Sequence, residues 1–426
     1  MPPTPAIELL TAVKSGDAGR VQSLLAEHPD LRARLDEPLA DGFEQPAILL
    51  AVDRNDRATV DALLDAGANV DARSRWWAGS FGVLDFAKPD LVPHLLERGA
   101  TVDAHSAARL EMRDRLEALL DARAELVHAR GGDGQTPLHF AATVDIASLL
   151  LDRGATIDAR CVDHESTPAQ YMVGDRLEVA RFLVTRGCWT DIMLGAALGD
   201  VGLVRRHLDA DPATIRTRVS DTYFPKQNPR SGGTIYRWTL GPDKTAHAIA
   251  RERGHAAVLA ELMARSSPEL RLVVAGEAGD ETAMKQSLAA DPTLFSKLSA
   301  DDLATLANGA RDNENDPVRA MLAAGWPVDA RGQHRATPLH WAAWNGNAGI
   351  ASDLIAANAP IDIKGDEYDG TPLTWAVYGS VHGWRCATGD YAGTVERLIA
   401  AGAKVPRLTP QLDASEPVRA VLAKHQ

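Results

Sequence analysis

Thr337-Pro-Leu-His-Trp-Ala-Ala-Trp-Asn-Gly-Asn347, followed by Asp353-Leu-Ile-Ala-Ala-Asn-Ala359, is the stretch of sequence that decides the fold. Thr337 suits the N-cap of a helix, and Pro338 suits its first turn because proline lacks the N–H that would be unpaired there. Gly346 ends this helix, and a second helix follows it. The apolar residues recur at helical spacing, so each helix has one buried face: Leu339, Ala342 and Ala343 in the first, and Ile350, Leu354 and Ile355 in the second.

Two helices this short cannot bury enough surface alone and must stack on neighbours. Imperfect copies supply those neighbours. Thr136-Pro-Leu-His-Phe-Ala-Ala142 and Thr371-Pro-Leu-Thr-Trp-Ala376 repeat the first helix. Gly67-Ala-Asn-Val-Asp71 and Gly154-Ala-Thr-Ile-Asp158 share an ending in which glycine supplies the left-handed residue that closes a helix.

The sequence motif T-P-L-H-x-A, which recurs with a period of about 33 residues, resembles the ankyrin repeat. That resemblance implies a mainly α fold, an ankyrin-repeat solenoid of stacked helix-turn-helix units with β-turn fingers. We expect about twelve repeats, several of them degenerate. The resemblance also implies that His139 and His340 bond to the backbone of a neighbouring finger, and that the protein recognises another macromolecule through its concave palm and its fingers.

We divide the chain into four parts. Residues 1–212 form N-terminal ankyrin repeats, 213–244 an inserted finger or hairpin, 245–407 C-terminal ankyrin repeats, and 408–426 a C-terminal cap. The cap keeps helical spacing in Val418, Val421 and Leu422.

The amino-acid composition limits the classes of partner that the protein can bind. Lys+Arg 45 against Asp+Glu 58 gives a net charge of −13, which argues against nucleic acid or an anionic membrane because both need a basic footprint. The N-terminal residues lack a basic region followed by an apolar run, and no apolar stretch approaches membrane length, so we expect neither a leader nor a membrane span. Three cysteines without a zinc or disulfide pattern fit a reducing compartment. We expect a cytoplasmic protein whose partner is another protein, with no cofactor, no metal and no catalytic motif.

Two segments break the repeat period, and the first is 214–243. Gly232-Gly233, followed by alternating residues from Thr234 to Trp238, predicts a turn and a strand in an enlarged finger. Tyr236, Arg237 and Trp238 are candidate binding residues, since Tyr, Arg and Trp are enriched where binding energy concentrates. The alternative is a solvated insertion whose aromatic residues pack on its own base.

The second break, Ser380 to Thr388, lies between the helices of the Thr371 repeat, just before Asp390 and Tyr391. We expect an ordered turn, with Trp384 packed on the helical body and the polar groups of His382 and Arg385 at the palm rim. The alternative for His382 is an ordinary hydrogen-bonding role.

Residues after the paired alanines of the first helix should face the palm, which makes Trp344, Asn345 and Tyr378 candidate binding residues. Trp341 and Trp375 are expected to be partly buried between repeats. The alternative is that these tryptophans fill a wide gap between repeats.

Two functions follow. The first is a protein-interaction scaffold that binds its partner through the palm and the fingers. The second is a small-molecule binding protein or enzyme. Its pocket would lie between the 221–241 finger and the aromatic-rich C-terminal repeats, and would be lined by His382, Arg385, Asp390 and Tyr391.

Overall fold

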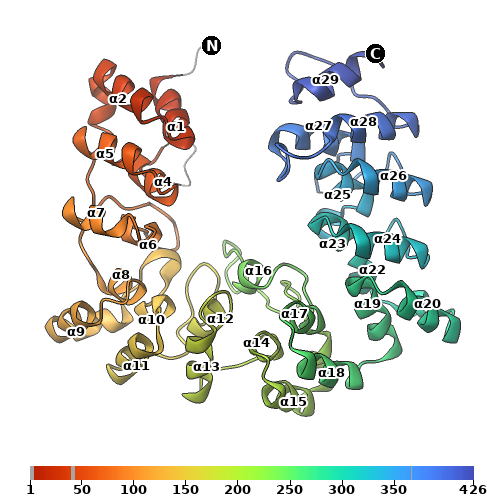
Figure 1. Ribbon diagram of the computed structural model, residues 1–426, viewed down its shortest axis with the longest axis horizontal. Helices are drawn as coiled ribbons and strands as arrows, with labels where there is room; N and C mark the ends of the chain where they lie inside the picture. Colours follow the sequence, from red (N-terminus) through yellow and green to blue (C-terminus); the bar gives the residue numbers. More distant parts are fainter. Residues whose placement is uncertain (1–3, 40–43, 366) are drawn as a thin grey trace. The chain divides into compact units, whose positions relative to one another are not determined.

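The computed structural model describes residues 4–39, 44–365 and 367–426. The chain forms two compact units (Figure 1): unit 1 comprises Met1–Asp211 and Thr217–Lys244, and unit 2 comprises Pro212–Arg216 and Thr245–Gln426. No helix in the described part of the chain is long and apolar enough to cross a membrane.

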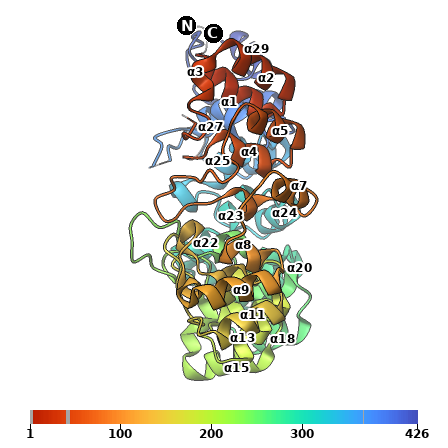
Figure 2. The ribbon, with the colours of Figure 1, turned by 90° about the vertical axis from the view of Figure 1, so that its left-hand side faces the viewer.

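The described helices of unit 1 follow in chain order: α1 (Pro5–Ser15), α2 (Ala18–Glu27), α3 (Pro29–Arg32), α4 (Ala47–Asp53), α5 (Arg57–Asp65), α6 (Val83–Phe86), α7 (Val92–Glu97), α8 (Ala104–Arg109), α9 (Arg113–Ala122), η1 (Ala124–His128), η2 (Gly132–Gly134), α10 (Pro137–Phe140), α11 (Val144–Asp152), α12 (Pro168–Met172), α13 (Leu177–Thr185), α14 (Ile192–Leu198), α15 (Val201–Ala210) and α16 (Tyr236–Thr239). Figure 2 shows them layered in chain order from α1 to α15.

Unit 2 has the same pattern of paired helices: η3 (Pro212–Arg216), α17 (Ala246–Glu252), α18 (Ala256–Arg265), α19 (Pro268–Ala278), α20 (Glu281–Ala290), α21 (Leu294–Lys297), α22 (Ala300–Leu303), α23 (Thr305–Asp312), α24 (Asn315–Ala323), η4 (Gln333–Arg335), α25 (Pro338–Trp344), α26 (Ala348–Ala356), α27 (Pro372–His382), α28 (Tyr391–Ala400) and α29 (Glu416–Ala423).

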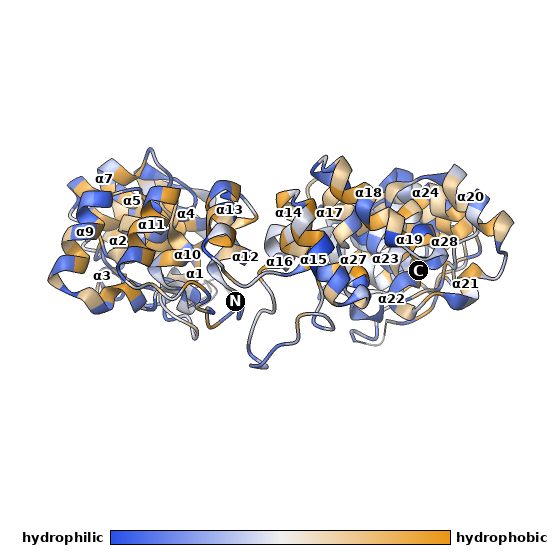
Figure 3. Cartoon of the chain, turned by 90° about the horizontal axis from the view of Figure 1, so that it is seen from below, coloured by the Kyte–Doolittle hydropathy of each residue, from blue (hydrophilic) through white to orange (hydrophobic). Residues whose placement is uncertain are grey.

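Stacking of helix pairs builds both cores. In unit 2, α25 contacts its own partner α26 and also α23 and α27, the first helices of the flanking repeats. Leu339 and Leu354 are fully buried in the shared core. At the end of the array α29 packs on α28 and buries the three apolar residues of the expected cap, Val418, Val421 and Leu422. Figure 3 shows hydrophobic and hydrophilic residues interspersed along the helices, as expected of amphipathic helices.

The threonine and histidine of the T-P-L-H motif form the hydrogen bonds that their positions predict. Thr337 and His340 form a capping box, in which the His340 Nδ1 accepts from the Thr337 backbone N–H at 3.2 Å. The His340 Nε2 lies 3.1 Å from the Gly370 carbonyl, and the His139 Nε2 lies 3.1 Å from the Ser166 carbonyl. The expected bonds from these histidines to the next repeat's backbone are confirmed. Burial lowers the pKa of His340 to about 4, so this ring is neutral and structural.

The strand expected at 234–238 is wrong. Tyr236–Thr239 is the short helix α16, and no strand occurs in the residues that the structure describes. The physical reason is burial on consecutive positions: Thr234, Ile235 and Tyr236 are all buried, whereas a strand would place neighbours on opposite faces. The Tyr236 hydroxyl donates to the Asp191 carboxylate at 3.2 Å, which turns the segment inward.

Candidate binding pocket

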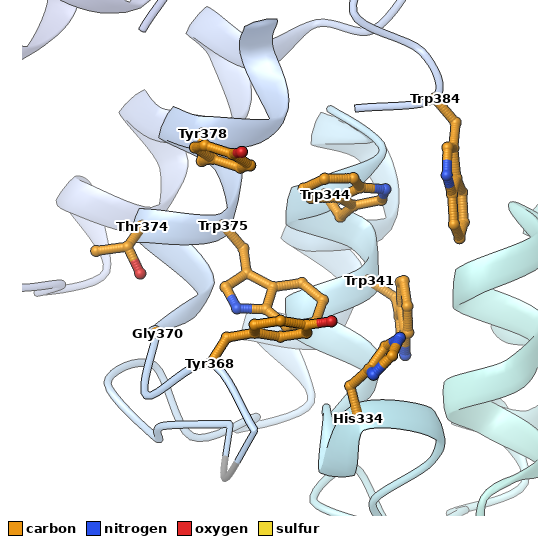
Figure 4. Close-up of a pocket in the computed structure, with 9 residues that line it drawn as sticks. All are labelled: His334, Trp341, Trp344, Tyr368, Gly370, Thr374, Trp375, Tyr378 and Trp384. Carbon is orange, nitrogen blue, oxygen red and sulfur yellow. The ribbon is translucent and has the colours of Figure 1, made fainter. Parts of the chain in front are cut away.

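Aromatic side chains of unit 2 surround a pocket of about 490 Å³ (Figure 4). Its walls come from the turn before α25, from α25, from the connection before α27, from α27 and from the inserted turn after α27. The lining residues are His334, Trp341, Trp344, Tyr368, Gly370, Thr374, Trp375, Tyr378 and Trp384.

Six of these side chains form pairs that are one repeat apart. Because α25 and α27 occupy equivalent positions in consecutive repeats and pack together, residues 34 positions apart lie side by side. The centroids of Trp341 and Trp375 are 5.2 Å apart, with the rings edge to face. The other two pairs are His334 with Tyr368 at 5.2 Å and Trp344 with Tyr378 at 6.3 Å.

The pocket has a buried floor and an exposed rim. Trp341 and Trp375 are only 2% and 8% exposed, as expected of rings between repeats. Tyr368, Tyr378 and Trp384 are 60%, 50% and 65% exposed. The floor therefore belongs to the core of the solenoid, while the rim presents large apolar surface to solvent.

The inserted turn completes the rim. Trp384 stacks on Trp341 with centroids 5.7 Å apart and meets Trp344 edge to face at 6.0 Å. The expected packing of Trp384 on the helical body is confirmed, although most of its surface stays exposed. The turn approaches α25 closely because Gly383 has no side chain: a Cβ there would lie 2.9 Å from the Trp344 carbonyl oxygen and 2.4 Å from the Tyr391 hydroxyl.

Gly383→Ala is expected to destabilise unit 2 by about 1–3 kcal/mol, since the added methyl group must push the turn away from α25. Urea unfolding measures the change. Gly349→Ala is a matched control, because the added Cβ in α26 meets nothing closer than 3.5 Å. Equal effects of the two substitutions would contradict the close-packed turn.

Two of the expected site residues are buried and do not line the pocket. The expectation that Asn345 faces the palm is wrong: its side chain is buried, and its Nδ2 donates to the Ala310 and Arg311 carbonyls at 3.0 and 2.9 Å. Tyr391 is also buried, and its hydroxyl donates to the Trp344 carbonyl at 2.8 Å. Burial raises the pKa of Tyr391 to about 12, so the hydroxyl keeps the proton that it donates.

The polar residues near the inserted turn lie beside the pocket and do not line it. His382 stacks on Tyr378 at 4.3 Å, and its Nε2 contacts the Asp413 carboxylate. Asp390 caps α28 by accepting from the Gly393 N–H at 2.8 Å. Arg385 is exposed.

The candidates in the insertion belong to unit 1. Tyr236 is buried, and Arg237 pairs with Asp221 at 3.4 Å. Trp238 is 75% exposed. The described residues that line the pocket all lie between 334 and 384.

Comparison with known families decides what these helix pairs are. A family model of the ankyrin repeat matches residues 133–162 and 334–366. The chain is an ankyrin repeat protein. The expected count of about twelve repeats stays a prediction. The second matched repeat carries His334, Trp341 and Trp344 of the pocket.

One similar protein is the palmitoyltransferase Hip14 of Drosophila melanogaster, which is 34% identical over 91 residues. The match covers 21% of this chain and 13% of Hip14. A similarity confined to so small a part of Hip14 carries no inference about transferase activity here.

Sequence reasoning missed four lining residues of this ankyrin repeat protein: His334, Tyr368, Gly370 and Thr374. His334 and Tyr368 lie in the connections that precede first helices, outside the helical positions that periodicity assigns to the palm. The signal that would have found them is their separation of 34 residues, the same as that of Trp341 and Trp375. Equal separations by one period place all three pairs in a single row.

Two acidic residues flank Tyr368 at the rim of the pocket. Among the residues that the structure describes, the lining contains no Lys, Arg, Asp or Glu. Tyr368 is flanked by Glu367 and Asp369, whose side chains are 52% and 79% exposed, and Asp369 pairs with Lys364 at 2.7 Å. The Glu367 carboxylate contacts the ring of His334, a lining residue. An aromatic pocket with carboxylates at its edge favours a cationic group over an anionic one.

Proposed function

We propose that this ankyrin repeat protein is a protein-interaction module that inserts a basic side chain of its partner into the aromatic pocket at 334–384. The observation that supports the proposal is the exposed aromatic rim over a buried tryptophan floor. Single exposed apolar residues are common, but three large rings around one cavity mark a contact surface. The alternative pocket, shared with the 221–241 finger, has no comparable set of residues in its favour.

The walls suit a lysine or arginine side chain. Ring faces carry negative partial charge, and a cation within about 6 Å of a ring centroid gains roughly 0.5–2 kcal/mol. The apolar stem of such a side chain packs against the indoles. Glu367 and Asp369 lie at the edge, where Glu367 contacts His334 and Asp369 pairs with Lys364. The net charge of −13 favours a basic partner over an acidic one.

We also place the protein in the cytoplasm. Cys161, Cys188 and Cys386 are all free thiols, which is typical of a reducing compartment.

The Tyr378→Ala/Trp384→Ala double substitution is expected to weaken partner binding about 30-fold, or roughly 2 kcal/mol, while changing stability by about 0.5–1 kcal/mol. Both rings are at least half exposed, so removing them leaves the core intact. The probe is an array of lysine- and arginine-containing peptides, and binding of the selected peptide is then measured by fluorescence anisotropy.

Two controls sharpen this test. Trp238→Ala removes an equally large exposed ring from unit 1 and should leave binding unchanged. Replacing the basic residue of the selected peptide by glutamine should abolish the signal. A peptide that binds equally well after either the double substitution or the glutamine replacement would refute the proposed pocket.

A further inference from the structure

A second cluster of side chains lies in unit 1, far along the chain from the pocket. Asp133, in η2, meets Asp163 and His164, which follow the first matched repeat. One ligand atom from each residue lies within 4.8 Å of the others. The side chains are largely buried, at 17%, 10% and 11% exposure.

The histidine has a defined orientation. Its Nδ1 lies 2.9 Å from the Gly233 carbonyl oxygen, which only accepts, so Nδ1 carries the proton. The Nε2 then faces the Asp163 Oδ2 at 3.6 Å and the Asp133 Oδ2 at 3.9 Å. An imidazole that donates from one nitrogen to a backbone carbonyl and presents the other to its ligands is the usual arrangement around a bound metal.

The two carboxylates are also held in place. The Asp163 Oδ1 accepts from the Gly232 N–H at 3.0 Å, which leaves Oδ2 for the cluster. The Asp133 carbonyl accepts from the Val162 and Asp163 N–H groups at 2.8 and 3.1 Å, which ties its turn to the neighbouring one. Each residue thus has one atom directed at a common point and is fixed through another atom.

The distances distinguish a cation from a direct ion pair. A protonated imidazole bonded to a carboxylate would sit about 2.7–2.9 Å from it, and both oxygens lie well beyond that range. Two ligands that each lie about 2.0–2.2 Å from one ion are separated by roughly 3–4 Å. The Nε2 distances of 3.6 and 3.9 Å to the two carboxylate oxygens fall within that separation.

We propose that Asp133, Asp163 and His164 bind a divalent transition-metal ion of the zinc type, which fastens the 214–243 insertion to the repeat at 133–165. One imidazole nitrogen and two carboxylate oxygens suit zinc, and the two carboxylates balance its charge. The second bonds of His164 and Asp163 go to Gly233 and Gly232 of the insertion. Binding the ion therefore orders the insertion as well as the site.

Glycine at 232 fits this role. An added Cβ there would lie 3.0 Å from the His164 Cε1 and 3.5 Å from the Asp163 Oδ2. The insertion can lie against the cluster only because this residue has no side chain.

The test uses the full chain, stripped with a chelator, and zinc chloride alone as the probe. Calorimetry is expected to show one zinc per chain. His164→Gln and Asp163→Asn are each expected to weaken binding at least 10-fold. His382→Gln is the matched control, because its ring also pairs with a carboxylate but is exposed in unit 2. It should leave zinc affinity unchanged.

A second measurement distinguishes a lost zinc site from a variant that has misfolded. Zinc is expected to slow tryptic cleavage after Lys226 and Arg230 at least 10-fold in the natural chain and to have no effect in His164→Gln. Circular dichroism of the variant, with the natural helical signal, shows that the fold is retained. No saturable zinc binding, zinc binding that survives His164→Gln, or binding of calcium or magnesium in preference to zinc would each overturn the proposal.

Discussion

Replacing Leu339 by alanine is expected to lower the free energy of unfolding of unit 2 by about 2–5 kcal/mol. Leu339 is fully buried on α25, in a core that it shares with α23, α26 and α27. Truncation leaves a cavity that helices held on three sides cannot fill. Because each repeat is stabilised by its neighbours, the loss should spread to α26 and α27.

Urea unfolding, followed by hydrogen exchange in peptides from α25 and α26, measures this effect. Hydrogen exchange reports on each unit separately, which matters because the unfolding transitions of the two units need not coincide. Val381→Ala is the control, since Val381 lies on α27 but is 39% exposed. It should change stability by less than about 0.5 kcal/mol. A loss below 1 kcal/mol for Leu339→Ala would show that α25 is not central to the core.

Unit 1 is expected to lose roughly 2 kcal/mol of stability between about pH 4 and pH 6 because of Asp191 alone. Burial raises the pKa of this carboxyl from its ordinary 3.8 to about 6. Asp191 caps α14 by accepting from the Leu194 N–H at 2.8 Å, and it also accepts from Tyr236. These bonds offset only part of the cost of burying the charge.

The direction of this pH dependence follows from the protons that the folded and unfolded states bind. Between pH 4 and 6 the folded state keeps the Asp191 proton and the unfolded state releases it, so folding takes up a proton. The contribution of the Asp191 carboxyl to the free energy of unfolding is fully present below about pH 4 and is lost as pH rises through 6. A shift of about two pKa units corresponds to roughly 2–3 kcal/mol, reduced somewhat because the side chain is partly exposed.

Asp191→Asn should remove this pH dependence while keeping an acceptor for the cap and for Tyr236. The measurement is urea unfolding from pH 4 to 6, followed in α14 peptides. Asp200→Asn, at the exposed cap of α15, is the control and should retain the natural pH profile. An unchanged profile in Asp191→Asn would mean that Asp191 is already ionised at pH 4 in the folded state.

The fold of this ankyrin repeat protein could be predicted from its sequence because the interactions that specify each repeat are local. Thr337 and Pro338 start a helix, Gly346 separates it from the next, and apolar residues at helical spacing require a neighbour. The aspartates that follow glycine at 200 and 280 cap their helices at 2.9 Å, as their order along the chain suggests. Periodicity also predicted part of the pocket, since Trp344 and Tyr378 were expected to face the palm.

Only the tertiary structure decided which side chains turn inward. Asn345, directly after α25, is buried and donates to carbonyls of α23, whereas Tyr378, within α27, stays 50% exposed. The segment at 234–238 has strand-like alternation, but Asp191 and Ser166, far away in sequence, bury it as a turn of helix.

Asp133 and His164 are 31 residues apart and match no metal motif, so their approach depends on how two repeat turns and the insertion pack. Sequence periodicity determined the helices and their stacking, because those depend on residues a few positions apart. The side-chain environments at the insertions depend on long-range contacts that no repeat pattern encodes.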